Sequence, residues 1–170
     1  MRAAGVILAV ALALAFQTTL ARFVIRGTVA IDLVLVVVVY VALTAGPVAG
    51  LFAGTVAGLV QDALLSTGVI GIGGLAKTIV GFLAGIVGTQ FIVVHSLPRF
   101  VVFFGASVLH AVVFMGLYVL LDLRHFGTPY AAVAGQAAGN AVIGVVAFRI
   151  VELLPGAVER RRAAKTRLRR

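Results

Sequence analysis

The sequence contains 170 residues, of which 62% are hydrophobic and only 11% are charged. Soluble globular domains average about 45–50% apolar and about 25% charged residues. A water-soluble fold is therefore excluded, and the lipid bilayer must be the solvent for most of the chain. The formal net charge is +9, but residues 160–170 hold seven of the fourteen Lys and Arg side chains. Such a run is typical of a cytoplasmic membrane anchor rather than of a nucleic-acid-binding surface.

Charged residues, Gly-Pro pairs and polar clusters divide the chain into six apolar segments, each close to the roughly 20 residues that a spanning helix needs. We therefore predict an all-α integral membrane protein, with one compact transmembrane domain over residues 1–158 and a basic cytoplasmic tail over residues 159–170. The predicted helices cover residues 4–21, 29–44, 47–65, 72–94, 99–121 and 130–154.

Each of the first three segments contains a sequence feature that bears on its structure. The first is interpreted as a retained span, because no clear A-x-A-like cleavage site follows Gln17. The second contains the β-branched run 34–41, which would suit a strand in water. In lipid a lone strand would leave its backbone unpaired, so a helix is expected. Gly46-Pro47 predicts a tight turn before the third helix.

The remaining breaks are a short loop at residues 66–71, the segment His95 to Arg99, a polar loop at 122–129 and Pro155-Gly156. With six spans, both termini lie on one side of the membrane. The basic residues expected on that side are Arg2, Arg99, Arg149 and seven in the tail, against Arg22, Arg26 and Arg124 on the other. The excess predicts that both termini are cytoplasmic.

Small residues recur at helical spacing in three segments. The positions are Gly46, Gly50, Gly54 and Gly58 on the third helix, Gly81 and Gly85 on the fourth, and Gly135 and Gly139 on the sixth. Glycine lets helix backbones approach within van der Waals contact, which is a main attraction between helices in lipid. We expect a dense bundle centred on these three helices. Whether one stripe instead binds a partner's helix is left open.

Polar residues inside the spans are the candidate functional groups, because they are costly in lipid. The main candidates are Asp32, Gln61, Asp62 and Lys77, which are expected in the outer half of the membrane with Gln17, Thr18, Gln136 and Asn140. Asp62 and Lys77 lie at matched depth on either side of a short turn, so we predict an ion pair between them. Arg149 and Glu152 are expected to pair at i, i+3. His110 is interpreted as a hydrogen-bonded packing residue.

Several kinds of catalytic chemistry lack support in the sequence. With no cysteine, the chain has neither disulfides nor a thiolate nucleophile. No H-E-x-x-H, G-x-S-x-G or P-loop pattern occurs, and the acids and histidines show no metal-ligand spacing. We therefore expect no enzymatic activity, no metal and no cofactor.

The middle of the chain resembles the rod shape-determining protein MreD family of bacteria. The resemblance is carried by residues 54–62 (GTVAGLVQD), 71–78 (GIGGLAKT) and 81–85 (GFLAG), with Asp32-Leu33 and the run 46–50 (GPVAG) before them. The order and spacing of these runs carry the resemblance over about residues 30–90. The chain departs from the family at Ile31, where a proline is common.

The resemblance implies a fold similar to the S components of energy-coupling-factor transporters. It also implies a place in the bacterial cytoplasmic membrane and binding to the single-span protein MreC. Through MreC it implies indirect contact with a SEDS glycosyltransferase, a class B penicillin-binding protein and the actin-like MreB. The function expected is a non-enzymatic scaffold of the elongation complex. The alternative is an S component that binds a small vitamin or metabolite, with the outer polar residues as its pocket.

Overall fold

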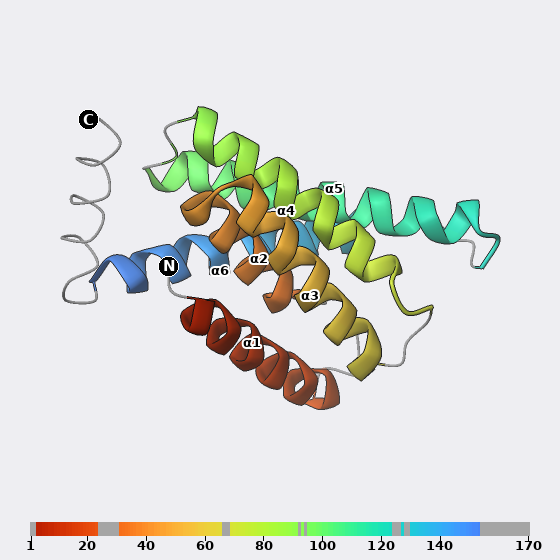
Figure 1. The fold of residues 1–170 in the computed structure, drawn as a ribbon. Coiled ribbons are helices and arrows are strands. Elements are labelled where there is room, and N and C mark those ends of the chain that lie inside the picture. The colour runs from red at the N-terminus through yellow and green to blue at the C-terminus, as the bar shows by residue number, and fades with distance from the viewer. Residues whose placement is uncertain are drawn as a thin grey trace.

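The computed structural model describes residues 3–23, 31–65, 69–91, 93, 95–123, 127 and 130–153. Over these ranges the chain forms six α-helices, which confirms the all-helical prediction (Figure 1). They are α1 (Ala3–Phe23), α2 (Leu33–Ala45), α3 (Pro47–Leu65), α4 (Ile72–Gln90), α5 (Ser96–Leu120) and α6 (Tyr130–Leu153). The predicted basic tail lies outside the described residues.

Three helix ends differ from their predicted positions by three residues or more. α2 begins at Leu33 instead of residue 29, because Asp32 caps its first turn. α4 ends at Gln90 instead of residue 94, because Phe91 has extended backbone angles. α5 begins at Ser96 instead of residue 99, and Pro98 falls in its first turn. Proline is tolerated there because its missing N–H would have no helical partner.

Four helices are long and apolar enough to cross a bilayer, namely α3, α4, α5 and α6. α1 and α2 contain shorter apolar stretches, Gly5–Thr19 and Leu33–Ala45. α2 has only 13 residues and is apolar on all sides, which is the pattern of a helix enclosed by others.

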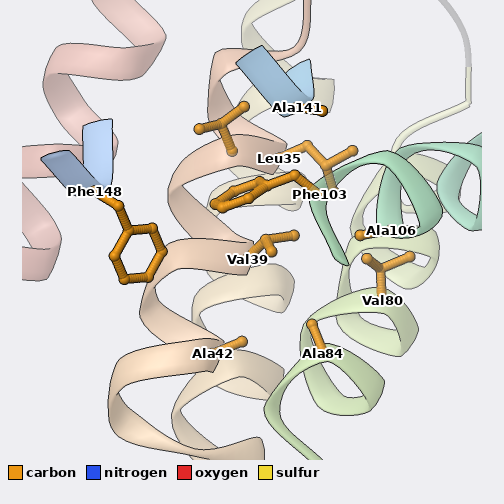
Figure 2. Packing of buried hydrophobic residues seen from close by; sticks show 10 residues of the cluster. Leu35, Val39, Ala42, Val80, Ala84, Phe103, Ala106, Ala141 and Phe148 are labelled. Carbon is orange, nitrogen blue, oxygen red and sulfur yellow. The ribbon is translucent and has the colours of Figure 1, made fainter. Parts of the chain in front are cut away.

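α2 is the central helix of the bundle. It contacts each of the other five, and around it α1 contacts α3, α3 contacts α4, α4 contacts α5, and α5 contacts α6. Its side chains Leu35, Val39 and Ala42 form one core with residues of α4, α5 and α6 (Figure 2). On its other side Val34 and Val38 pack against α1 and α3. The core therefore surrounds α2 on nearly all sides.

The glycine stripe of α3 packs inside the bundle, against α4. A Cβ on Gly50 would collide with the Gly81 carbonyl oxygen, one on Gly54 with the Lys77 carbonyl oxygen, and one on Gly58 would lie 2.6 Å from Gly74 Cα. At the end of this interface, a Cβ on Gly85 would collide with Pro47 Cα. Of the two uses left open by the sequence, this geometry supports internal packing.

Two details of the glycine prediction differ from the structure. Gly46 does not belong to the packed stripe: it connects α2 to α3 with φ of +93° and its N–H donates to Ala42 O. This backbone conformation is strained for other residues, so Gly46 is a turn residue. The expected grouping of the third, fourth and sixth helices is wrong, because within the described residues α6 contacts only α5 and α2.

Candidate functional site

The N-terminus of α2 lies deep inside the bundle and starts with a charged residue. The Asp32 side chain accepts a hydrogen bond from Leu35 N at 2.9 Å, as an N-cap does. Asp32 is only 4% exposed. A carboxylate in such a place needs an opposite charge nearby, because burying a lone ion is very costly.

Lys77 of α4 supplies that charge. Its Nζ lies 2.7 Å from Asp32 Oδ2 and 3.1 Å from His110 Nε2 on α5. An ammonium group has donors only, so His110 Nε2 must accept, and the ring proton of His110 is then on Nδ1. The three groups together form a charge-balanced set: one carboxylate, one ammonium and one neutral imidazole.

Asn140 of α6 and Ser107 of α5 extend this network. The Asp32 N–H donates to Asn140 Oδ1 at 2.9 Å, and Asn140 Nδ2 donates to Ser107 Oγ at 3.1 Å. Ser107 Oγ in turn donates to Phe103 O. Asn140 is fully buried. The backbone of α2 is thereby tied to α6, and α6 to α5.

α1 and α3 each bring a glutamine to the same end of α2. Gln17 Oε1 accepts a hydrogen bond from Val34 N at 3.3 Å. Gln61 lies one turn beyond Ala57, which packs against Val34 and residues of α1, so helical spacing turns Gln61 toward the start of α2. Gln61 is 7% exposed, and its Oε1 is the buried side-chain atom without a hydrogen-bond partner in the described part of the chain.

All five surrounding helices therefore contribute polar side chains around the start of α2. We call this set the polar cluster; its members are Gln17, Asp32, Gln61, Lys77, Ser107, His110 and Asn140. Asn140 lies ten residues after the start of α6, and His110 lies ten residues before the end of α5. Each is therefore about 15 Å from that nearer end of its helix, at 1.5 Å per residue. A helix that begins at such depth needs partners for its free N–H groups, and the polar cluster supplies them.

A comparison with protein-family models identifies the chain. The model of the rod shape-determining protein MreD matches residues 2–155. The chain belongs to the MreD family. No curated protein and no solved structure gives a match. The family confirms the resemblance drawn from residues 30–90 and extends it over all six helices; its proteins are bacterial membrane proteins that determine cell shape.

The ion pair predicted between Asp62 and Lys77 is not the one in this MreD-family protein. Asp62 Oδ2 instead accepts hydrogen bonds from Gly71 N at 2.9 Å and Gly74 N at 3.0 Å. It thereby binds free N–H groups at the start of α4, where a carboxylate is favoured by the helix dipole. Lys77 lies level with Gly54 of α3, eight residues before Asp62, and the two side chains face different neighbours.

The predicted pair of Arg149 and Glu152 is also wrong. Glu152 of α6 binds Arg99 of α5 with two hydrogen bonds, at 3.0 and 2.5 Å, in the fork geometry that suits arginine and carboxylate. The Arg99 guanidinium also lies over the Phe148 ring, 4.5 Å from its centroid. Arg149 donates to Ser96 Oγ at 2.9 Å. Arg99, expected as the first residue of the fifth helix, is 2% exposed and lies in the first turn of α5.

Sequence reasoning placed Asp32, Gln61 and Lys77 in one polar layer, but it did not pair Lys77 with Asp32. It interpreted His110 as a hydrogen-bonded packing residue, and the contact with Lys77 agrees with that interpretation. It gave no role to Ser107, and it used Arg99 only as a basic residue on the side of the termini. One signal could have found the centre of the site: an acid directly before an entirely apolar helix is an N-cap on a buried helix, and must have a buried partner.

No group of three or more His, Asp or Glu residues that could hold a metal occurs in the described part of the chain. Asp32, Lys77, Arg99 and Glu152 satisfy one another. The surface left outside these pairs is strongly apolar on α1, α3, α4, α5 and α6, as at Ile7, Phe52, Phe82, Val101 and Val146.

Proposed function

We propose that this MreD-family protein is a non-enzymatic membrane scaffold of the rod complex. It binds an MreC-like single-span protein, and in this way it supports peptidoglycan synthesis and the maintenance of cell shape. The observation that carries the proposal is the family match over residues 2–155, which includes every helix of the bundle.

The distribution of polarity supports a role in assembly rather than in catalysis. Four of the charged side chains described above form two ion pairs between helices, Asp32 with Lys77 and Arg99 with Glu152. The outward side chains are large and apolar, so contacts with a partner inside the membrane must come from van der Waals packing. Such a protein contributes a rigid surface to a complex. Its indirect partners in this proposal are a SEDS glycosyltransferase, a class B penicillin-binding protein and MreB.

We infer that the protein lies in the bacterial cytoplasmic membrane with both termini in the cytoplasm. The support is the distribution of basic residues in the sequence, ten on the side of the termini and three on the other, with Lys77 inside a span. The polar cluster then lies toward the outer face, and the Arg99–Glu152 pair toward the cytoplasm. A reporter fused after Arg170 that is active only outside the membrane would contradict this orientation.

Gentle purification from the native membrane tests the function. The tagged protein should recover an MreC-like single-span protein in stoichiometric amount, and the gene should restore rod shape to cells that lack their own MreD. The failure of both assays with a correctly inserted, folded protein would overturn the scaffold proposal.

One observation favours a second function. Gln61 Oε1 is a buried acceptor without a partner in the described residues, and a ligand with a hydrogen-bond donor would satisfy it. In this alternative the protein is an S component that binds a small vitamin or metabolite, with the fold implied by its family resemblance. The test is co-purification with ATPase subunits and a rise in melting temperature with a vitamin, neither of which a scaffold predicts.

A further inference from the structure

The start of α2 has one backbone donor more than the polar cluster satisfies. The N–H groups of Asp32, Val34 and Leu35 each donate to a side chain of the cluster. The Leu33 N–H, which lies between them, has no hydrogen-bond partner among the described residues. An N–H group inside a membrane bundle needs an acceptor, because lipid offers none.

α3 brings one buried acceptor that also lacks a partner. Gln61 Oε1 accepts no hydrogen bond within the described part of the chain, and Gln61 is only 7% exposed. The residue lies one turn beyond the fully buried Ala57, on the same face of α3. Leu33 packs against the apolar cluster that contains Ala57. The free donor and the free acceptor therefore lie on the same side of α2.

The two groups also lie at the same level of the bundle. α2 and α3 run antiparallel, and a Cβ on Gly50 would lie 2.7 Å from Ala42 Cβ. Eleven residues further along α3 is Gln61, and eleven residues back along α2 is Ile31. Leu33 follows two residues later, which is about 3 Å along the axis. The N–H groups of a first turn point back along the helix axis, so the Leu33 N–H points toward the level of Gln61.

Gln17 of α1 supplies a third polar group at this place. Its Oε1 accepts from Val34 N at 3.3 Å, so the Nε2 of the same carboxamide is a further donor at the start of α2. α1, α2 and α3 all contact one another, so a molecule bound between them must be small. A buried water molecule typically makes about three hydrogen bonds, and it can both donate and accept.

We propose that one ordered water molecule is bound at the start of α2, where α1, α2 and α3 meet. It accepts hydrogen bonds from Leu33 N–H and Gln17 Nε2, and it donates one to Gln61 Oε1. The water thereby joins α3 to the hydrogen-bond network of the polar cluster. The site is independent of the scaffold function, and it assigns Gln61 Oε1 to water rather than to the vitamin of the alternative function.

Magnetisation transfer from water to backbone N–H groups, measured by NMR, tests the site. The protein is deuterated, carries isotope-labelled leucine and is held in lipid nanodiscs, and Leu33→Ile assigns the Leu33 signal by removing it. The Leu33 N–H should show a cross-peak at the water frequency. The Leu35 N–H is the internal control, because it donates to the Asp32 carboxylate, and it should show none.

Gln61→Met gives an independent readout, because methionine has a similar length and lacks the acceptor. With the water bound in the native protein, the variant loses one of its hydrogen bonds. The Leu33 cross-peak should disappear, and the melting temperature should fall by about 2–4 °C, the shift expected for one hydrogen bond in a protein of this size. Gln90→Met is the matched control, since Gln90 is exposed at the end of α4, and it should change neither quantity.

Each other result overturns the water site. An unchanged or higher melting temperature of Gln61→Met would show that Oε1 has no partner in the native protein. A Leu33 cross-peak that persists in this variant would mean that the N–H reaches bulk water. If the variant does not fold, the unsubstituted protein decides alone, and a missing Leu33 cross-peak excludes the water. Neither measurement involves recovery of a partner, so the water site and the scaffold function can fail separately.

Discussion

The two ion pairs of this protein differ in how far water can reach them. The Asp32 and Lys77 side chains are 6% and 3% exposed, and both lie among the polar cluster. In the second pair Arg99 is 2% exposed but Glu152 is 30% exposed. The first pair joins α2 to α4 near the middle of α5, and the second joins the start of α5 to the end of α6.

This difference determines what each pair contributes. When both charges are buried, removing one leaves the other unpaired in a poorly hydrated place. The resulting loss of stability is larger than the net stabilisation that the intact pair provides. When one partner already reaches water, that partner can be solvated without the other, so the intact pair contributes less to stability. The Asp32–Lys77 pair should therefore determine whether α2 packs in its position at the centre of the bundle. The Arg99–Glu152 pair should stabilise only one end of the contact between α5 and α6.

The largest effect is expected from Lys77→Met. The substitution keeps the length of the side chain and removes its charge, so Asp32 is left buried without its counter-ion. We expect a loss of about 3–5 kcal/mol of unfolding free energy, the range found for broken buried pairs, and a loss of rod-shape complementation. Thermal unfolding in detergent measures the first, and cell morphology the second.

The matched control is the double variant Asp32→Asn with Lys77→Met. Asparagine still caps a helix, and no unpaired charge remains, so the double variant should be more stable than Lys77→Met alone. Additive losses from the two single variants would mean that the residues do not interact, and the polar cluster would lose its central contact.

The next effect should come from Gly54→Ala, which acts on the same pair through the backbone. A methyl group at this position collides with the Lys77 carbonyl oxygen and pushes α4 away from α3. We expect a loss of about 2–3 kcal/mol, as for overpacked cores. Gly105→Ala is the control, because a Cβ there has no heavy atom within 4 Å. Equal stability of both variants would contradict the close α3–α4 contact.

These residues show what the sequence could and could not predict. Apolar segment length and Gly-Pro breaks gave six helices, because in lipid each segment must satisfy its own backbone, and α3 has the predicted bounds. Depth along a helix also follows from residue number. The direction in which a side chain points depends on which helices become neighbours, so Lys77 was assigned to Asp62 rather than to Asp32. The sequence-based prediction did not place α2 at the centre of the bundle, although its uniformly apolar sequence is typical of an enclosed helix.

A smaller effect is expected from Glu152→Gln at the other pair. The amide can still accept one hydrogen bond from Arg99, and the buried guanidinium keeps its hydrogen bond to Val93 O and its contact with the Phe148 ring. We expect a loss of about 1–2 kcal/mol, below that of Lys77→Met. Unfolding in detergent measures it, and a loss equal to that of Lys77→Met would show that access to water does not separate the two pairs.

The smallest effects compare one hydrogen bond to a serine from each region. Ser107→Ala removes the acceptor of Asn140 Nδ2 inside the polar cluster, and Ser96→Ala removes the acceptor of Arg149 at the exposed end of α5. Hydrogen bonds between membrane helices contribute about 0.6 kcal/mol on average and up to about 1.7. Ser107→Ala should fall in the upper part of that range, because Asn140 is fully buried and has no water to replace the lost partner. Ser96→Ala should change stability by less than about 0.5 kcal/mol, since Arg149 is exposed and water can solvate it. Melting temperatures measured side by side in one detergent give the order, and a larger loss for Ser96→Ala would show that burial does not rank these contacts.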